Sequence, residues 1–501
     1  MAGGLPPGPG KTSSTSRVDA RALVGQRDRP PGASLPARLD DVVFVSNRGP
    51  LAFHFEDGVP VAGVTAGGLA GSLHPLVEGT GATWVACALT DADRAAAAAG
   101  LMRDPGFHIE LVDPDPDVYR MAYDVVSNAT LWFCHHHLFD GARRPRSDRH
   151  WAEAWEAYET YNRLFAERVA AVAPEGGRVL VQDYHLMLVG QQLERVRPDL
   201  STVHFTHTPF ADPSALRMLP DEVRDALLDG MAAYRTCGFH SPRWSAAYQA
   251  CQRDRLGDGA GVEGSPAPPV FVSPLGTDAD RLLESARSQA VVDAGAVLDE
   301  LIGTGRQVIV RVDRMELSKN LLRGFWAFDE LLERQPQRRG RLVFLALAYP
   351  SRQGLAEYLA YQNEVEATVA RINERWGTPD WTPIVLEVED DYPRSLAALK
   401  RYDVLLVNPV RDGMNLVAKE GPLVNERDGV LVLSREAGAF DELSPACVGV
   451  NPFDVTGTAR ALAAALDTAG ERRRAWAEEL RAIVGRRPPA VWLADQLGAA
   501  G

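Results

Sequence analysis

Short apolar runs, each suited to a buried strand, recur along this chain and limit what it can fold into. The runs lie at 42–45, 179–181, 203–205, 308–310, 342–345, 404–407 and 430–433. Helix-length amphipathic stretches, such as 151–172 and 353–376, separate many of them. Strands that alternate with helices in this way form parallel α/β sheets with helices on both faces.

The predicted strands fall into two sets, at about 42–275 and about 305–450, and each set is large enough for its own core. We therefore expect two Rossmann-like, doubly wound domains that face each other across a cleft, where open α/β sheets bind ligands. The expected division is a flexible tail at 1–40, an N-terminal domain at 41–278, a C-terminal domain at 279–480 and a helix at 481–501 that packs back.

Charge and composition exclude several classes of protein. The 53 basic and 67 acidic side chains give a net charge of −14, which argues against a nucleic-acid binder. No apolar run reaches the length of about 18 residues that a membrane span needs. The N-terminus lacks the apolar core of a secretory signal, and the five cysteines form no C-x-x-C pair. We expect a cytoplasmic protein with reduced thiols, either monomeric or a homo-oligomer.

Charged side chains follow the later strands, where a ligand would lie. Arg314 and Lys319 come directly after the strand at 308–313 and fit a clamp for a diphosphate, although a solvated surface loop is the alternative. Asp412 follows the strand at 404–407 and suits sugar hydroxyls. Glu420, on the helix that begins after it, could reach the hydroxyls of a ribose.

In the first half, a carboxylate and an imidazole follow adjacent strands. Asp183 comes after 179–181 and His207 after 203–205, which makes a catalytic cleft plausible. Gly67 and Gly68 open a helix, either as a ligand loop or as a tight turn. The run at 135–137 is three histidines, for which packing and surface roles are favoured over a metal site, because consecutive side chains cannot all face one ion.

Several longer motifs resemble the trehalose-6-phosphate synthase family, retaining glycosyltransferases with the two-domain GT-B fold. The resemblance extends over about 42–495. The motifs are SNR at 46–48, GGL at 67–69, SNATLW at 127–132, DYHL at 183–186, H-x-P-F at 207–210, PSR at 350–352, RDGMNLVAKE at 411–420 and VNPFD at 450–454.

This resemblance implies transfer of glucose from UDP-glucose or GDP-glucose to O1 of glucose 6-phosphate, with no metal and no cofactor. It implies catalytic roles for Asp183, His207, Arg314, Lys319 and Asp412. The acceptor would be held by Arg48, Tyr123, Trp132, Asp183 and Arg352. The donor would be held by Gly67, Gly68, His207, Arg314, Lys319, Asp412, Leu416, Val417, Ala418, Lys419 and Glu420.

The chain departs from the resembling pattern beside the predicted diphosphate clamp. The common string VDRLDYSKG is here VDRMELSKN at 312–320, which leaves the base of the donor open. The alternative function is that of a pseudo-glycosyltransferase, which couples a nucleotide-activated cyclitol to an amino-cyclitol phosphate. The five acceptor residues that the resemblance implies are all present, and this favours the synthase.

Overall fold

The structure is a computed structural model and describes residues 35–64, 68–104, 106–256, 269–352 and 354–501. It contains an eight-stranded sheet of order β10-β9-β8-β7-β1-β4-β6-β5, parallel except where β5 meets β6. The strands are β1 (Val42–Val45), β4 (Thr83–Cys87), β5 (Arg103–Asp104), β6 (Phe107–Val112), β7 (Arg178–Gln182), β8 (Ser201–Thr206), β9 (Thr236–Phe239) and β10 (Val270–Val272).

The winding of this sheet reverses between β1 and β7. From β1 the chain proceeds to β4 and β6 on one side, and from β7 to β8, β9 and β10 on the other. The helices of this part are α1 (Gly68–Val77), α2 (Asp91–Ala98), α3 (Pro116–Arg120), α4 (Trp132–His135), α5 (Arg149–Val172), α6 (Val189–Val196), α7 (Pro213–Leu216), α8 (Asp221–Ala232) and α9 (Pro242–Leu256).

A second, six-stranded parallel sheet has the order β13-β12-β11-β14-β15-β16 and reverses its winding between β11 and β14. The strands are β11 (Gln307–Arg314), β12 (Leu342–Tyr349), β13 (Ile384–Glu387), β14 (Val404–Val407), β15 (Val430–Ser434) and β16 (Val448–Val450). The two parallel, doubly wound sheets confirm the predicted fold class.

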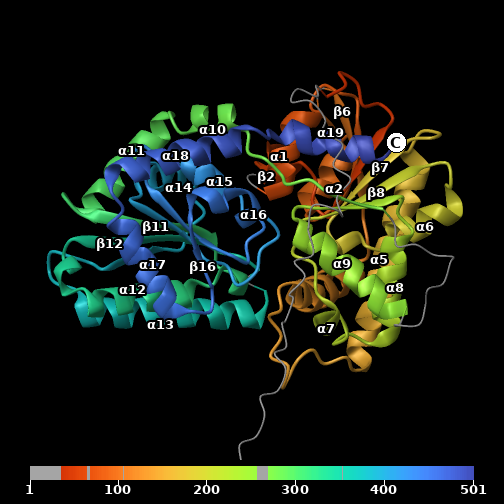
Figure 1. Cartoon of the computed structure of the whole chain (residues 1–501). Coiled ribbons are helices and arrows are strands. Elements are labelled where there is room, and N and C mark those ends of the chain that lie inside the picture. The colour runs from red at the N-terminus through yellow and green to blue at the C-terminus, as the bar shows by residue number, and fades with distance from the viewer. Residues whose placement is uncertain (1–34, 65–67, 105, 257–268, 353) are drawn as a thin grey trace, which may run out of the picture. The chain divides into compact units, whose positions relative to one another are not determined.

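Helices cover both faces of the six-stranded sheet (Figure 1). One face carries α12 (Leu321–Arg334), α13 (Ala356–Trp376) and α17 (Val455–Leu466). The other carries α11 (Gln289–Ile302), α14 (Tyr392–Arg401), α15 (Val417–Val424) and α18 (Gly470–Gly485). The short helices α10 (Ala279–Ser285) and α16 (Phe440–Leu443) complete this part.

The predicted strands form because their residues are apolar on both faces. Every residue of β1, β14 and β15 is buried, as a parallel sheet with helices on both sides requires. In α5, by contrast, the buried residues recur at helical spacing, among them Trp151, Tyr158 and Phe165. All seven apolar runs that were predicted as strands are strands in the structure.

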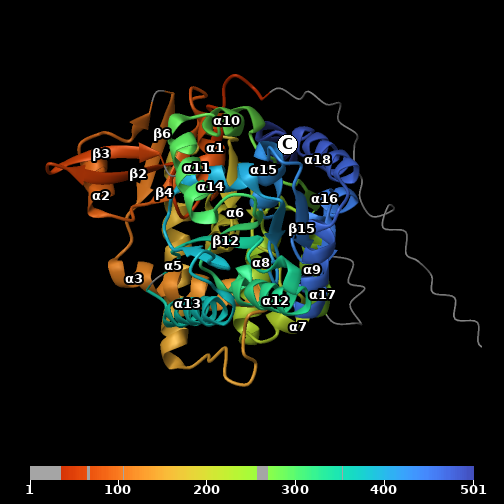
Figure 2. The same ribbon diagram turned by 90° about the vertical axis from the view of Figure 1, so that its left-hand side faces the viewer.

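A hairpin of β2 (Leu51–Glu56) and β3 (Val59–Val64) was not predicted. It lies beside α2 (Figure 2). Asp93 of α2 accepts hydrogen bonds from the backbone N–H of Phe53 in β2 and of Thr90, while the Thr90 side chain accepts from the Asp93 N–H. This capping box fixes the start of α2 and one strand of the hairpin together.

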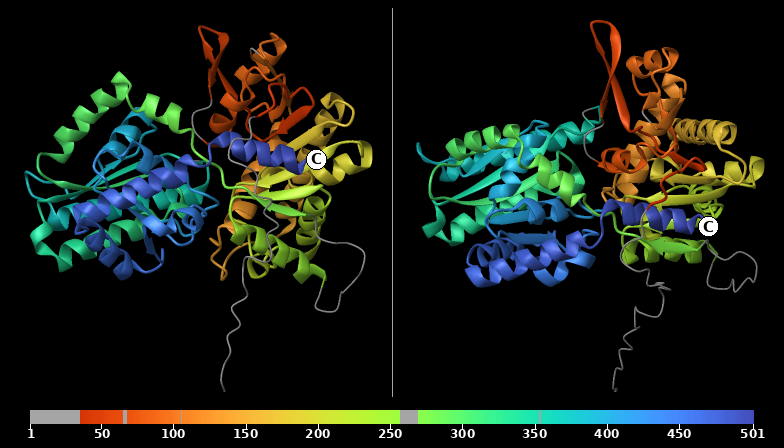
Figure 3. Two further views of the ribbon diagram at one scale, coloured as in Figure 1. Left: turned by 45° about the horizontal axis from the view of Figure 1, so that its top comes forward. Right: turned by 90° about the horizontal axis from the view of Figure 1, so that it is seen from above.

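The helix α19 (Pro489–Ala499) packs into the core of the eight-stranded sheet (Figure 3). Trp492 is fully buried, and its ring centroid lies 5.1 Å from that of Phe205 in β8. Gln182 at the end of β7 donates to the side chain of Gln496 at 3.0 Å. No helix in the described part of the chain combines the length and apolarity that a membrane span requires.

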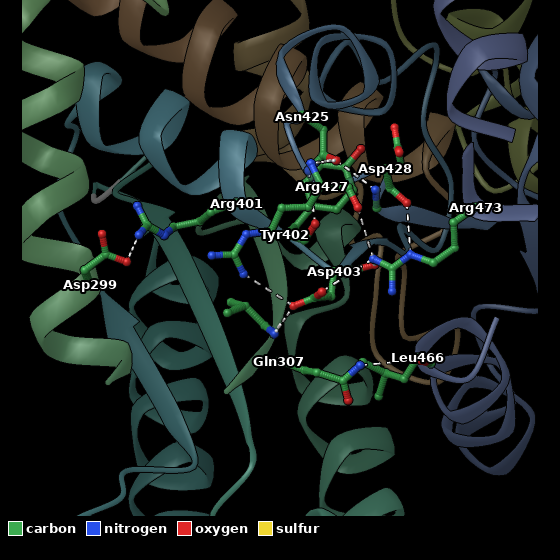
Figure 4. A network of polar contacts seen from close by, with 12 residues as sticks. Asp299, Gln307, Arg401, Tyr402, Asp403, Asn425, Arg427, Asp428, Leu466 and Arg473 are labelled. Carbon is green, nitrogen blue, oxygen red and sulfur yellow. Dashed lines mark hydrogen bonds and ion pairs between the residues drawn. The ribbon is translucent and has the colours of Figure 1, made fainter. Parts of the chain in front are cut away.

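A polar network holds the amino end of β14, away from the strand end where the candidate site lies. Figure 4 shows Asp403, whose carboxylate accepts from the Val308 N–H at 2.8 Å and lies 3.4 Å from the Arg473 guanidinium. Arg427 lies 3.8 Å from the same carboxylate. These charges tie β14 to β11 and α18, so they serve the fold.

Candidate functional site

The predicted diphosphate clamp lies where the six-stranded sheet reverses its winding. Arg314 is the last residue of β11, and Lys319 ends a short 3₁₀ turn (Leu317–Lys319) directly after it. Asp412 lies in the loop that leads from β14 to α15, and its Oδ2 is 2.6 Å from Lys319 Nζ. Open α/β sheets bind ligands at such a point of reversal. The structure thus brings together charges that are far apart in the sequence.

Each cation of the clamp is paired with a carboxylate. Burial lowers the pKa of Lys319, but the carboxylates around it, Asp412 first, together raise that pKa above its ordinary value. Burial raises the pKa of Asp412, and Lys319 brings it below its ordinary value. Arg314 Nη1 lies 2.8 Å from Oε1 of Glu316, yet the Arg314 side chain remains 43% exposed. Both pairs are therefore ionised, and Arg314 is open to a ligand.

A buried guanidinium fixes the loop that carries Lys319. Arg311 Nη2 donates to Asp313 Oδ2 and to the Lys319 carbonyl, both at 2.7 Å. Asn320 has a left-handed φ of 61°, and its side chain donates to the carbonyls of Asn408 and Pro452. Asparagine adopts this conformation more readily than most residues. Asn320 can therefore stand where the resembling string VDRLDYSKG has glycine.

Gly413 brings the loop of Asp412 against the other sheet. A Cβ at Gly413 would lie 1.8 Å from the carbonyl oxygen of His207, the residue after β8. The Gly413 carbonyl accepts a hydrogen bond of 3.0 Å from the Trp244 indole. Only glycine permits this approach, so loops from the two sheets share one site.

The predicted donor residues from Leu416 to Glu420 form the junction into α15. Asn415, with a φ of 78°, accepts a hydrogen bond from the Ala418 N–H at 3.2 Å. The N–H groups of Lys419 and Glu420 bond to the Leu416 carbonyl, both at 2.8 Å. Val417 is the first residue of the helix, where amides can receive a phosphate.

The side chains of Lys419 and Glu420 have different surroundings. Lys419 Nζ is buried between Glu442 and the Leu275 carbonyl, so its ammonium already has structural partners. Only its backbone remains for the predicted donor role. For Glu420 the described residues supply no hydrogen bond or ion pair, and burial raises its pKa to about 7. This carboxyl suits hydroxyl groups that a ligand would bring.

Asp183 occupies a strained conformation at the end of β7. Its φ of 71° and ψ of 169° lie in a region that almost only glycine adopts, at a cost of about 1–3 kcal/mol. Its Oδ1 accepts a hydrogen bond of 3.2 Å from the His207 N–H, and burial raises its pKa to about 6. Strain of this kind is found at functional sites, which supports the choice of Asp183.

His207 is neutral and has partners for both ring nitrogens. Nε2 lies 2.9 Å from the Gln182 side-chain oxygen, and Nδ1 lies 3.0 Å from His240 Nε2. Burial and the neighbouring His240 keep the pKa of His207 well below its ordinary value. A donor that contacts His207 would therefore meet an uncharged imidazole.

Arg352, which follows β12, lies among aromatic residues of the other sheet. Its guanidinium stands 4.7 Å from the ring centre of buried Trp132 and donates to the Tyr184 hydroxyl at 3.2 Å. It also donates to the Tyr358 hydroxyl and lies 3.7 Å from Glu316. The contacts of Arg352 therefore bring its own segment together with two other predicted acceptor segments, that of Trp132 and that of 183–186.

Tyr123 and Arg48 lie differently. Tyr123 belongs to a π-helix (Met121–Leu131), an element that is frequent at functional sites. Its ring stacks between those of Tyr119 and His185, at centroid distances of 5.1 and 5.6 Å. Arg48, three residues after the end of β1, has an exposed side chain and lines a cavity of about 170 Å³ with Phe53.

Gly67 lies outside the described residues, whereas Gly68 is the first residue of α1. The three histidines contact three different groups, as the packing and surface roles predict. His135 accepts from the Ala211 N–H, His136 bonds to the Trp132 carbonyl, and His137 contacts Arg411.

Sequence reasoning missed Glu316, Tyr358 and His240. For Glu316 a signal existed, since it stands between two predicted clamp cations in the string RMELSK. Tyr358 lies within α13, a stretch that only its amphipathic spacing marked, and His240 follows β9, which was not predicted. Nothing in their local sequence separates them from core residues.

Comparison of the sequence and the structure with known proteins shows to which family the chain belongs. The profile of glycosyltransferase family 20 matches residues 40–499. A bifunctional trehalose-6-phosphate synthase/phosphatase of Thermoproteus tenax is 36% identical over 387 residues, 75% of this chain and 52% of that protein. This chain thus spans about half the length of that relative. A trehalose-6-phosphate synthase of Mycolicibacterium smegmatis is 32% identical, covering 85% of this chain and 86% of the relative.

Solved structures agree with these relatives. A UDP-forming synthase from Burkholderia xenovorans, named as an α,α-trehalose-phosphate synthase, has a TM-score of 0.78 at 27% identity and covers 92% of this chain and 98% of its own. The E. coli enzyme bound with UDP-2-fluoro glucose has the same TM-score and coverage at 25% identity. With a family profile that matches nearly the whole described chain, and relatives above 30% identity over most of it, this protein belongs to glycosyltransferase family 20.

Proposed function

We propose that this protein transfers glucose from a nucleotide-glucose to O1 of glucose 6-phosphate and so makes trehalose 6-phosphate. The observation that carries the proposal is the meeting of two sets of residues from the two sheets. The donor set surrounds Lys319 and Asp412, the acceptor set includes Trp132 and Asp183, and Gly413 and Arg352 each contact the opposite sheet. We assign the acceptor to the 41–278 domain and the nucleotide-sugar to the 279–480 domain.

In this reaction the bond between the glucose C1 and the diphosphate oxygen breaks, and a bond from C1 to O1 of the acceptor forms on the same face. The acceptor proton passes to the departing phosphate. Arg314 and Lys319 take up the negative charge that grows on the diphosphate, a stabilisation that needs no metal. When the donor binds, Lys319 can stay paired with Asp412 and donate its other N–H groups to phosphate oxygens, and the remaining lone pairs of the Asp412 carboxylate can accept from hydroxyls of the sugar.

Asp183 accepts a hydrogen bond from a hydroxyl of the acceptor, and this bond is strongest when the carboxyl group is ionised. Its pKa of about 6 meets that condition at neutral pH. The names of the relatives favour UDP-glucose as the donor, since one solved relative is called UDP-forming and another carries UDP-2-fluoro glucose. A further relative from Burkholderia xenovorans is described in complex with glucose 6-phosphate.

The test is an assay of purified protein with glucose 6-phosphate against UDP-glucose, GDP-glucose and ADP-glucose, with the product identified by mass and by digestion with a trehalose-specific phosphatase. We expect one nonreducing, α-linked phosphorylated disaccharide. If no nucleotide-glucose gives product and an amino-cyclitol phosphate couples with an activated cyclitol, the pseudo-glycosyltransferase function is correct instead.

A further inference from the structure

Glu316 is a fully buried carboxylate between the two predicted half-sites. It follows β11 by two residues, and one of its oxygens, Oε1, lies 2.8 Å from Arg314 Nη1 and 3.7 Å from Arg352 Nη1. The Ser351 hydroxyl donates to the same oxygen at 3.1 Å. The other oxygen, Oε2, is buried and has no hydrogen-bond partner among the described residues. One oxygen atom therefore carries all of the contacts.

The two guanidinium groups that share Glu316 have different proposed ligands. Arg314 belongs to the clamp for the donor diphosphate, and Arg352 belongs to the acceptor set through Trp132 and Tyr184. The Asp412 carboxylate, by comparison, has hydrogen-bond partners among the described residues only in the donor-side Lys319 and in its own neighbour Asn415. Among ion pairs of the described residues, Glu316 alone joins a donor-side cation to an acceptor-side cation.

We propose that Glu316 is a positioning residue that orients Arg314 and Arg352 together, so that the donor and acceptor half-sites depend on one carboxylate. This inference rests on the proposed function, because it takes the donor and acceptor roles of the two arginines from it. Glu316 itself contacts neither substrate, since it is enclosed in the protein.

The charge of Glu316 is maintained by the arginines that it orients. Burial raises the pKa of Glu316, but the surrounding charges, those of Arg314 and Arg352 first and that of Lys319 after them, together hold the pKa below its ordinary value. An arginine has five N–H donors in a planar fork. Arg314 can therefore keep Nη1 on Glu316 while its other N–H groups face a diphosphate, and Arg352 can do the same toward a phosphate.

Replacement of Glu316 by glutamine tests this role with little change of shape. Glu316→Gln keeps an oxygen toward the arginines and removes the charge. We expect the Kd of UDP and the Kd of glucose 6-phosphate each to rise roughly tenfold, because each arginine loses the charge that orients it, and contacts within one ion-pair network have coupling energies of this order. The matched control is Glu333→Gln, because Glu333 also pairs with an arginine, Arg375, near the C-terminal ends of α12 and α13, at the opposite edge of the same sheet. It is expected to change neither Kd.

Double variants separate positioning from a general disturbance. In an Arg352→Ala background, Glu316→Gln is expected to raise the Kd of UDP about tenfold and to leave the Kd of glucose 6-phosphate nearly unchanged. In an Arg314→Ala background, Glu316→Gln is instead expected to raise the Kd of glucose 6-phosphate about tenfold and to leave the Kd of UDP nearly unchanged. Loss of folding would instead change both constants in both backgrounds. Glu316→Asp, which keeps the charge but withdraws it by one methylene, is expected to raise both constants by a smaller factor and serves if the glutamine variant does not fold.

The inference is overturned if Glu316→Gln weakens only one ligand or neither, or if its two effects persist in both double variants. These outcomes are distinct from failure of the proposed function. In that case the wild-type protein itself would bind neither UDP nor GDP, or would not bind glucose 6-phosphate, in the same calorimetric titrations.

Discussion

The two points where the sheets reverse their winding have the same topology but differ in their charged groups, which are paired at one point and, among the described residues, neutral or without an ion pair at the other. At β11/β14 the charged groups are paired at close range, as Lys319 and Asp412 show. At β1/β7 the pKa of Asp183 is raised to about 6 and Arg48 is exposed, and at the end of the adjacent β8 the imidazole of His207 is neutral. The fold thus fixes where a ligand lies, whereas the side chains fix what kind of charge it meets.

The difference has a chemical reason under the proposed function. A diphosphate gains charge as it leaves, so its site needs cations that are held in place before the reaction, and carboxylates hold them. An acceptor phosphate keeps its charge throughout, so an exposed arginine suffices to bind it. The comparison predicts that variants on the β11/β14 side change the rate of reaction and that variants on the β1/β7 side change binding or pH dependence.

The largest effect is expected for Lys319→Ala. Loss of one charge-assisted contact in an enclosed site costs about 3–4 kcal/mol of transition-state stabilisation, so kcat should fall about 10²- to 10³-fold. Steady-state kinetics with saturating substrates measures it. The control is Lys400→Ala, which removes a lysine that pairs with Glu426 in the same part of the chain, away from the site. A Lys319→Ala protein with normal kcat and a raised donor KM would contradict the comparison.

The next effect concerns pH. Because burial raises the pKa of Asp183 to about 6, its carboxylate is protonated below pH 6, and kcat/KM for the acceptor should fall about tenfold for each pH unit below that value. Asp183→Asn should abolish this dependence and lower kcat/KM at pH 8 by about 10- to 100-fold.

The stability of Asp183→Asn distinguishes this role from a folding contact. A carboxyl whose pKa is raised in the folded state destabilises that state when ionised, so its stability contribution worsens as pH rises from 4 to above 6. Replacement by the neutral amide should therefore leave the Tm at pH 8 unchanged or higher. A lowered Tm together with lost activity would indicate that Asp183 is only a structural residue.

A smaller effect is expected for Arg48→Ala. The side chain is exposed and remote from the reacting carbon in the proposed complex, so its removal should raise the KM for glucose 6-phosphate about tenfold with little change in kcat. Donor binding should be unchanged, as titration with UDP would show. Loss of donor binding with a normal acceptor KM would reverse the two assignments.

Removal of metal ions is expected to have no effect. The cations at β11/β14 are side chains, so activity should survive exhaustive dialysis against EDTA. Complete loss of activity that Mg²⁺ or Mn²⁺ restores would contradict the roles given to Arg314 and Lys319.

The sequence was sufficient to predict seven of the strands, β1, β7, β8, β11, β12, β14 and β15, and the positions of the charged residues that follow several of them. Runs such as 404–407 are apolar on both faces, and Asp412 or Asp183 can be placed at a sheet edge because parallel strands end on one side. The hairpin β2–β3 was missed because its strands have no sequence pattern typical of a buried strand. Phe53 is the one buried residue of β2, and β3 contains proline and glycine, which are rare in strands.

Pairings between distant residues could not be predicted in this way. The burial of Lys419 depends on Glu442 and on the Leu275 carbonyl, which lies 144 residues away in the chain. The positive φ of Asp183 likewise has no signal in the local sequence, because aspartate rarely adopts this conformation. Local propensity carries no information about such contacts, so residues of one motif, such as Lys419 and Glu420, can have different surroundings.

The helix α19 has a consequence for the order in which the protein is completed on the ribosome. Its residues Trp492 and Leu493 fill a core that also contains Phe44 and Trp84, from strands that are synthesised first. The strands of the eight-stranded sheet are therefore synthesised well before α19, whose side chains complete the apolar core of that sheet. The whole six-stranded sheet is synthesised in between. Until α19 is made, the apolar surface of the eight-stranded sheet remains open to chaperones and to other nascent chains.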